Sequence, residues 1–184
     1  MGIIPQIVSY RLEDQIYKLD FITKIYQNDS VKRIIMLSGY VHLWKIIMLQ
    51  TIETVRQQLQ TAEGTTKVDL LNTLSGLWRN VNLAESYQSA SEALALAQQS
   101  AYTTGIMDAH NNLGVFYWSK SDYNRALEHF QRAAELALPL NDTYRLGLAW
   151  HNVGEMYRYQ SNYDLAFEYH NKALHLFTQI RQVV

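Results

Sequence analysis

The sequence predicts an all-α fold: a right-handed superhelical stack of helix-turn-helix hairpins (an α-solenoid) with extra N-terminal helices. First, residues 111–117 (NNLGVFY) return forty positions later as residues 151–157 (HNVGEMY), and a fixed period of about 20 to 50 residues is typical of stacked-repeat proteins. Second, the 184 residues include only 2 prolines and 8 glycines, so helices can run long. Third, apolar residues recur at spacings of three and four, which is the helical period.

The composition excludes several classes of function. The net charge is -1, whereas a nucleic-acid partner normally requires a basic face, so we expect no nucleic acid. The chain has no cysteine, which rules out disulfides, thiolate metal sites and cysteine nucleophiles. With 48% hydrophobic residues, the chain has ample material for a core.

Residues 1–62 are expected to form an N-terminal helical segment. Apolar residues at helical spacing predict an amphipathic helix over 12–26, which the polar residues 28–30 (NDS) then interrupt. Residues 51–60 predict a further amphipathic helix.

The apolar run 34–49 admits three interpretations. We favour a buried helix that packs against the repeats; a signal-like segment and a helix on a membrane surface are the alternatives. The preceding Lys32 and Arg33 resemble the start of a secretory signal. However, His42 and Lys45 interrupt the run, which is too short to cross a membrane. The sequence therefore disfavours a membrane partner and predicts a cytoplasmic location, with export left open by this run.

Residues 63–184 are expected to form a domain of three hairpins, which begins with a linker at residues 63–66 (EGTT). Three segments align at a lag of forty: 67–106, 107–146 and 147–184. Each contains a helix, a short polar turn and a second helix. The turns are residues 80–82 (NVN), 120–122 (KSD) and 160–162 (QSN). Each turn ends in Asn or Asp, whose side chain can cap the following helix.

These residues resemble the tetratricopeptide repeat, whose pattern combines a large residue, Leu-Gly and Tyr on one helix with Ala, an aromatic residue and Ala on the next. The middle segment matches it with His110, Leu113, Gly114, Tyr117, Ala126, Phe130 and Ala133. The last segment matches it with Trp150, Val153, Gly154, Tyr157, Ala166, His170 and Ala173. The first segment is degenerate and has Leu74 in the place of the glycine. The resemblance covers about two thirds of the chain.

The resemblance implies packing roles for the repeated positions. Gly114 and Gly154 should let the two helices of a hairpin approach closely, with Ala126 and Ala166 as the facing small residues. Leu74 predicts a wider or shifted first hairpin. The tyrosines expected to fill the space between hairpins are Tyr117, Tyr157, Tyr123 and Tyr163.

A period of forty is longer than the usual 34 of this family, and it resembles the repeats of bacterial signalling regulators. The resemblance implies a non-catalytic module for protein–protein interaction that binds a peptide or partner segment in the concave groove of the stack. The alternative is a signal-input or self-association fragment of such a regulator, without its output domain, in which residues 177–184 contact a second copy. Because stacked repeats need their end face covered, another copy, a partner or a further segment should cover that end.

In a tetratricopeptide stack the first helices line the groove, and Asn72, Asn112 and Asn152 stand at the same position of the three segments. An amide side chain both donates and accepts hydrogen bonds, so a ladder of asparagines can bind the backbone of an extended peptide. Similar ladders occur in the repeats of O-GlcNAc transferase and kinesin light chain. The alternative is that each asparagine links neighbouring helices.

The other candidate groove residues lie around this ladder. They are Leu71, Ser75, Trp78, Asn111, Val115, Trp118, His151, Glu155 and Arg158. Aromatic and arginine side chains often anchor interfaces, although burial of the tryptophans against residues 1–60 is the alternative. The lysine clamp with which some family members bind a chaperone's carboxyl terminus is not matched, because Leu71, Asn111 and His151 stand where lysines would be needed.

Neither catalysis nor metal binding is expected. His110 and His170 occupy packing positions of the repeat, and the sequence has no His-Glu-x-x-His spacing. It also lacks a glycine-rich phosphate loop and a nucleophile elbow. We therefore expect no enzyme activity, no metal site and no cofactor.

Overall fold

The computed structural model of the chain describes residues 40–183, which form seven α-helices and no strand. The helices are α3 (Tyr40–Leu59), α4 (Gly64–Trp78), α5 (Leu83–Gln99), α6 (Thr103–Ser119), α7 (Tyr123–Ala137), α8 (Thr143–Tyr159) and α9 (Tyr163–Val183). The predicted all-α class is confirmed. The helix expected over 12–26, the break at 28–30 and the first part of the apolar run lie outside the described residues.

The chain divides into two compact units, Met1–Glu53 and Thr54–Val184, and the division falls inside α3. In the described part of the first unit, α3 buries Met48 and Ile52 and exposes Ile46 and Leu49. Residues 40–49 of the apolar run are thus helical, with one buried side. Among the helices that the structure describes, none is both long enough and apolar enough to cross a membrane.

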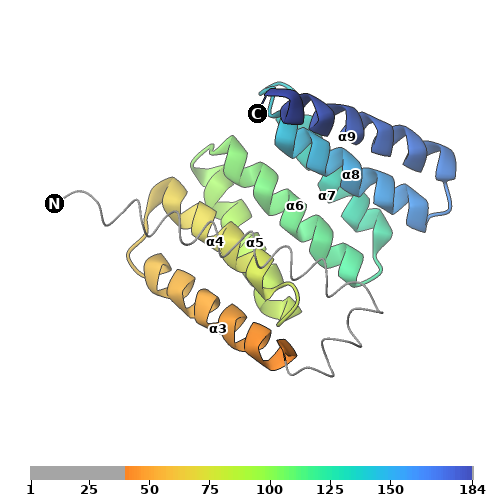
Figure 1. Ribbon diagram of the computed structural model, residues 1–184. Helices are drawn as coiled ribbons and strands as arrows, with labels where there is room; N and C mark the ends of the chain where they lie inside the picture. Colours follow the sequence, from red (N-terminus) through yellow and green to blue (C-terminus); the bar gives the residue numbers. More distant parts are fainter. Residues whose placement is uncertain (1–39, 184) are drawn as a thin grey trace. The chain divides into compact units, whose positions relative to one another are not determined.

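The second unit is a stack of three helical hairpins (Figure 1). Helix α4 pairs with α5, α6 with α7 and α8 with α9, and each hairpin packs against the next. Helices α4, α6 and α8 follow one another across one side of the stack, which we call the first-helix face. Side chains forty residues apart therefore stand on successive equivalent helices, as the repeat predicted.

The loop between α3 and α4 corrects the predicted linker. Helix α3 ends at Leu59 and α4 begins at Gly64, so the loop covers residues 60–63 and most of the expected linker lies in the first turn of α4. Gly64 has a φ of 57°, which glycine adopts without steric cost. A domain boundary after residue 62 stays a prediction.

Four of the turns share one backbone conformation that recurs every twenty residues. Ala101, Ser121, Asn141 and Ser161 have φ values of 52°, 59°, 52° and 61°. In each turn the next residue donates its backbone N–H to a carbonyl five positions earlier, for example Tyr102 to Ala97 at 2.8 Å. This is the Schellman motif, in which one residue with a left-handed conformation ends a helix.

The turn within each hairpin also starts the second helix, as predicted. The side chain of Asn82 accepts from the backbone N–H groups of Ala84 and Glu85. Asp122 accepts from Arg125 at 3.1 Å, and Asn162 accepts from Leu165 at 3.3 Å. Asp142 caps α8 in the same way, at 3.0 Å from the backbone nitrogen of Arg145. Each cap satisfies N–H groups that the first turn of a helix leaves free.

The core is a series of clusters, each of which joins neighbouring hairpins. The cluster between the first and second hairpins contains Val68, Leu71, Ala93, Ala97 and Ala109. The two clusters between the second and third hairpins contain Met107, Ala133, Ala134, Ala137, Leu146 and Ala149 in one, and Ala126, Phe130, Val153 and Met156 in the other. Alanines on the second helices allow the neighbouring helix to approach closely. Stability therefore depends on contacts between adjacent hairpins.

The glycines of the repeat face rings rather than alanines. A Cβ added to Gly114 would lie 2.5 Å from the ring of Phe130, and one added to Gly154 would lie 3.0 Å from the ring of His170. The expected close approach is present, but the partner of each glycine is the aromatic position of the second helix. This corrects the pairing with Ala126 and Ala166, which are buried in the core instead.

In the first hairpin the large side chain is on the first helix and the small one is on the second. Leu74 stands at the glycine position and Ala90 at the position of Phe130, and both are buried. Next to them the hydroxyl of Ser86 donates to the backbone carbonyl of Ser75 at 2.8 Å, which links α4 to α5. A large residue on the first helix is therefore matched by a small residue on the second, and the wider or shifted first hairpin expected from Leu74 stays a prediction.

The repeated tyrosines do not share one environment. Tyr123 stacks on Tyr159 across two hairpins, with ring centroids 4.9 Å apart. Tyr117 stacks on His129 within its own hairpin, and Tyr157 similarly stacks on Tyr169. Tyr163 has no following hairpin among the described residues and is largely exposed. Only part of the predicted filling between hairpins is thus observed.

Candidate interaction surfaces

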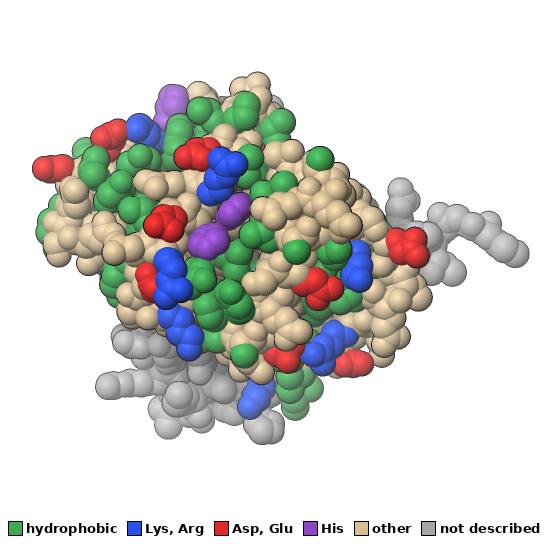
Figure 2. All heavy atoms as spheres, turned by 180° about the vertical axis from the view of Figure 1, so that it is seen from behind, with side chains coloured by type: hydrophobic (Ala, Val, Ile, Leu, Met, Phe, Trp, Pro, Cys, Tyr) green, Lys and Arg blue, Asp and Glu red, His purple; other side chains and the backbone are tan. Residues whose placement is uncertain are grey.

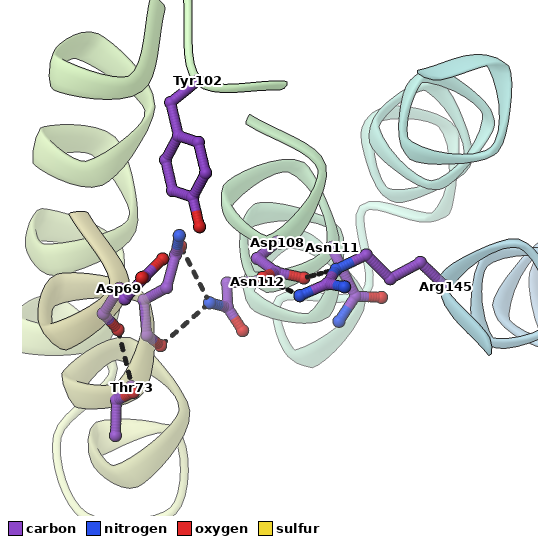
Figure 3. A pocket seen from close by; sticks show the side chains of 8 residues that line it. Asp69, Thr73, Tyr102, Asp108, Asn111, Asn112 and Arg145 are labelled. Carbon is purple, nitrogen blue, oxygen red and sulfur yellow. Dashed lines mark hydrogen bonds and ion pairs between the residues drawn. The ribbon is translucent and has the colours of Figure 1, made fainter. Parts of the chain in front are cut away.

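A polar pocket of about 390 Å³ lies on the first-helix face and is formed by all three hairpins (Figure 3). We call it the first-helix pocket. It is lined by Asp69, Asn72, Thr73, Tyr102, Asp108, Asn111, Asn112 and Arg145. These side chains come from α4, α6, α8 and the residue that precedes α6, so the pocket exists only because the hairpins are stacked.

The predicted asparagines link successive first helices. The Asn72 amide donates to the backbone carbonyl of Gly105 at 3.1 Å, and Asn112 donates to the backbone carbonyl of Asn72 at 3.0 Å. Asn152 donates to the side-chain oxygen of Asn111 at 2.8 Å. The structure therefore shows the linking role that the sequence left as an alternative. Asn111 and Asn112 also line the pocket, whereas Asn152 does not.

An ion-pair network forms one wall of the pocket. The guanidinium of Arg145 binds both carboxylate oxygens of Asp108, at 2.7 and 2.8 Å, and also bonds Asp142 at 2.9 Å. The bonds to Asp108 raise the pKa of Arg145 further above its ordinary value. Burial alone would raise the pKa of Asp142, but the backbone N–H and guanidinium of Arg145 lower it overall. The network connects the second hairpin to the third and leaves the charge of Asp108 compensated.

Asp69 lies on the opposite wall without a cation. Among the described residues its carboxylate takes part in no ion pair, and the hydroxyl of Tyr102 points toward it (Figure 3). Burial raises the pKa of Asp69, and the negative charge of Asp108 adds to this effect. Burial and Asp69 likewise raise the pKa of Tyr102. The pocket thus presents one uncompensated carboxylate.

The two tryptophans expected in the groove differ in burial. Trp78 is buried, and the guanidinium of Arg56 lies 5.3 Å from its ring centroid. Val115 and Trp118 pack against the core cluster between the second and third hairpins, where Trp118 also meets the ring of Tyr159 at 6.2 Å. Trp78 is therefore covered by the protein itself, which corrects the expectation that it lines a groove, whereas Val115 and Trp118 are partly exposed and their place in a groove stays a prediction.

The remaining predicted groove residues gather at the end of the stack. The rings of His151 and His170 lie 5.1 Å apart, and the Glu155 carboxylate lies 3.3 Å from Nε2 of His170. Arg158 donates to Glu155 at 2.7 Å and thereby lowers the pKa of that carboxyl group. His151, Glu155 and Arg158 therefore form a polar group on the third hairpin, away from the first-helix pocket.

A second histidine pair lies inside the middle hairpin. Nδ1 of His110 is 2.9 Å from Nδ1 of His129, so one ring donates and the other accepts. Burial lowers the pKa of His110 to about 4, and the charges of His129 and Arg132 contribute. Burial also lowers the pKa of His129. Within the described part of the chain no three histidine, aspartate or glutamate side chains converge as metal ligands do, and the expectation of no metal site stays a prediction.

Sequence reasoning missed the charged members of the pocket. Asp69, Asp108 and Arg145 do not recur at a lag of forty, so the repeat did not mark them. They do lie three, four and seven residues before Asn72, Asn112 and Asn152, which is the spacing of one helix face. Following that spacing back from each asparagine would have found them.

Comparison with known proteins finds a family model that matches part of the chain. Residues 105–179 match the family model described as "Tetratricopeptide repeat". These residues are thus similar to tetratricopeptide repeats. The match spans nearly all of α6 to α9, where the glycine and aromatic positions of the repeat are complete. No curated protein matches the sequence. Tetratricopeptide repeats generally serve protein–protein interaction through the surfaces of the stack.

Two solved structures share the fold of this chain. The crystal structure of aspartyl phosphate phosphatase F from Bacillus subtilis aligns with a TM-score of 0.63 at 18% identity, over 75% of this chain and 36% of that chain. BtubC (BKLC) from P. vanneervenii aligns with a TM-score of 0.58 at 16% identity, over 97% of this chain and 75% of that chain. The chain thus spans about a third of the length of the phosphatase. At these identities the likeness concerns the fold alone.

Charges are mixed on the face of the protein opposite to that seen in Figure 1. Figure 2 shows acidic and basic side chains interspersed with hydrophobic ones over the described residues of that face. Such a surface is typical of a solvated face without a single dominant charge. The expectation of no nucleic-acid partner stays a prediction.

Proposed function

We propose that this chain is a non-catalytic tetratricopeptide module that binds an extended segment of a partner protein at the first-helix pocket. The observation that supports this proposal most strongly is the pocket itself, in which the three hairpins bring amides, a hydroxyl and carboxylates together. Side chains of this kind donate to and accept from a peptide backbone.

The uncompensated carboxylate of Asp69 favours a positively charged group in the bound segment. Asp108 is ion-paired with Arg145, whereas among the described residues Asp69 has only the neutral hydroxyl of Tyr102 beside it. A lysine, an arginine or a free amino terminus would supply the missing charge and a charge-assisted hydrogen bond. The amide groups of Asn111 and Asn112 lie in the same pocket and can contact the adjacent peptide groups.

The test uses fluorescein-labelled peptide pools that are random except at one position, fixed as Arg, Lys, Leu or Glu. We expect the Arg and Lys pools to bind more tightly, as measured by fluorescence anisotropy. Asp69→Asn should reduce the ratio of affinities for basic over non-basic pools about tenfold, because a charge-assisted bond contributes about 1.5–3 kcal/mol. Asp164→Asn, on the exposed side of α9, is the matched control. An unchanged preference in Asp69→Asn, or no binding of any pool, would contradict the proposal.

The pH dependence of peptide binding tests the role of the Asp69 carboxylate in a second way. Since the pKa of Asp69 is raised, Asp69 takes up a proton at a higher pH than an exposed aspartate would. Binding of the Arg pool should therefore weaken as the solution becomes mildly acidic, and Asp69→Asn should lose this dependence.

A further inference from the structure

The end face of the third hairpin corresponds to a surface that is covered in the second. On α7 the covered residues are Tyr123, Leu127 and Ala134. Tyr123 stacks on Tyr159 of α8 at 4.9 Å, Leu127 packs against the adjacent core cluster, and Ala134 is only 9% exposed. The repeat therefore shows which positions of a second helix receive the next helix.

The counterparts of these residues on α9 are uncovered in this chain. Tyr163, Phe167 and Leu174 are 67%, 71% and 60% exposed. Their spacing places them along one side of α9, and we call them the end stripe. Phe177, which the sequence suggested as part of a contact surface, is half-buried and packs beside Gly147 and Tyr144 instead.

The centre of the end face has a different chemistry from its counterpart in the second hairpin. Glu155 and His170 stand where the second hairpin has Val115 and Phe130. Glu155 lies 3.3 Å from Nε2 of His170 and also accepts from Arg158. The surface is therefore polar at its centre, with apolar side chains on both sides along α9.

This pattern does not suit a further helix of the α8 type. Helix α8 places Val153 and Met156 against Phe130 in the core cluster. The same apolar side chains would cover Glu155 and His170 and remove this ion pair from water, which is unfavourable. The occupant must instead be polar at its centre and apolar on both sides.

Helix α9 itself has this pattern. Phe167, His170 and Leu174 give the order apolar, polar, apolar, which is the same in both chain directions. An antiparallel copy of α9 would place Phe167 against Leu174 of the second copy, with the two His170 side chains near the centre.

We propose that the end face is a two-fold interface with a second copy of this chain, formed by antiparallel packing of α9 against α9. Such a contact is isologous, since the same patch serves both copies and no further surface is left to extend the assembly. It uses no residue of the first-helix pocket and is independent of the function proposed for that pocket.

The first test measures the mass of the full chain by sedimentation over a wide range of protein concentrations. The unmodified chain should form a dimer, and Phe167→Glu or Leu174→Glu should weaken dimerisation by about tenfold or more, as expected for central interface residues. Leu140→Glu is the control, because Leu140 is 52% exposed in the turn before α8. Helical melting of each variant verifies folding. A monomer at every concentration, or a dimer that Phe167→Glu and Leu140→Glu affect equally, overturns the proposal.

The second test fixes the register, using the absence of native cysteine. Asn171→Cys lies close to the expected two-fold axis and should form a disulfide between copies on mild oxidation. Asp164→Cys is the comparison, because the two copies of that position would be separated by about thirteen residues of helix, or roughly 20 Å. Cross-linking through Asp164→Cys in place of Asn171→Cys overturns the antiparallel arrangement.

Discussion

At the scale of single residues, Gly114 and Gly76 show how differently two helical glycines can be surrounded. A Cβ at position 114 would lie 2.5 Å from the Phe130 ring, whereas a Cβ at position 76 would meet only a guanidinium nitrogen of Arg79, at 3.8 Å. The first glycine is required by a buried aromatic ring. The second has space for a methyl group, and glycine in a helix costs about 0.5–1 kcal/mol relative to alanine.

The two alanine substitutions should therefore have opposite effects. We expect Gly114→Ala to destabilise the protein by about 1–3 kcal/mol, because the Phe130 ring must shift within a packed core. Gly76→Ala should stabilise it by up to about 1 kcal/mol. Urea unfolding followed by circular dichroism measures both. A loss of stability in Gly76→Ala comparable to that in Gly114→Ala would contradict the close contact at Phe130.

The histidine pair of the middle hairpin should make stability depend on pH. The pKa of His110 is lowered to about 4 by burial and by the charges of His129 and Arg132, whereas an exposed histidine has a value of 6.5. The unfolded chain thus binds a proton at a higher pH than the folded chain. The associated stability is complete above pH 6.5 and is lost as the pH falls from 6.5 toward 4.

We expect His110→Phe to reduce this loss by about 1–2 kcal/mol, since solvent screening diminishes the full effect of the shifted pKa. An aromatic side chain suits the position, because Trp150 occupies it in the third hairpin. The measurement is the melting temperature as a function of pH. His175→Gln, on the exposed side of α9, is the control. Equal pH slopes for His110→Phe and the unmodified chain would refute the role of the buried pair.

Some of these residues were predictable and others were not. The repeat correctly marked Gly114 and Gly154 as positions of close approach, because only glycine fits there and the spacing is strict. It did not identify Phe130 and His170 as their partners. A forty-residue repeat shows which residues occupy equivalent positions, but it does not show which residues contact one another. Trp78 was misplaced for a similar reason: helical spacing defines a face but not whether solvent or a neighbouring helix covers it.

At the scale of helices and turns, the recurring left-handed residue ends each helix at the same point. Ala101, Ser121, Asn141 and Ser161 all have positive φ, a conformation that asparagine tolerates better than alanine. The turn after α4 is different, because Asn82 bonds the carbonyl of Trp78 and no residue in it has a positive φ. Val81 occupies the equivalent position there, and a β-branched side chain disfavours the left-handed conformation.

Replacing the left-handed residue by glycine should therefore have graded effects. Ala101→Gly removes a steric penalty of about 1–2 kcal/mol, and the greater freedom of glycine in the unfolded chain offsets about half of it. We expect a net stabilisation of about 0.5–1 kcal/mol, with a smaller gain in Asn141→Gly. Chemical denaturation of both variants measures the difference. A larger gain in Asn141→Gly than in Ala101→Gly would disagree with the steric account.

Helices and caps were the most predictable part of the structure. Polar turns that end in Asn or Asp marked the start of α5, α7 and α9, because those side chains satisfy free N–H groups of the first turn. The linker was displaced because glycine and threonine are as compatible with the first turn of α4 as with a loop. Boundaries set by small polar residues are therefore harder to predict than those set by a cap.

At the scale of the whole molecule, adjacent hairpins are linked by polar bonds as well as by the core. Asn72 and Asn112 link the first and second hairpins, and Arg145 and Asp108 link the second and third. The asparagines were visible in the sequence because they recur. The ion pair was not, since each of its members occurs once. The stack was thus predictable from the repeat, whereas the pocket depends on side chains that break the repeat.

The identical turns at Ala101 and Asn141 have a consequence for how such chains change in length. Both are followed by a residue that starts a helix, Tyr102 and Asp142, and both have a φ of 52°. Excision of residues 102–141 would join Ala101 to Asp142 and recreate the same junction with one hairpin fewer. Gene duplication or loss at these points would leave the local geometry intact, so family members with different numbers of hairpins can arise without redesign of the connections.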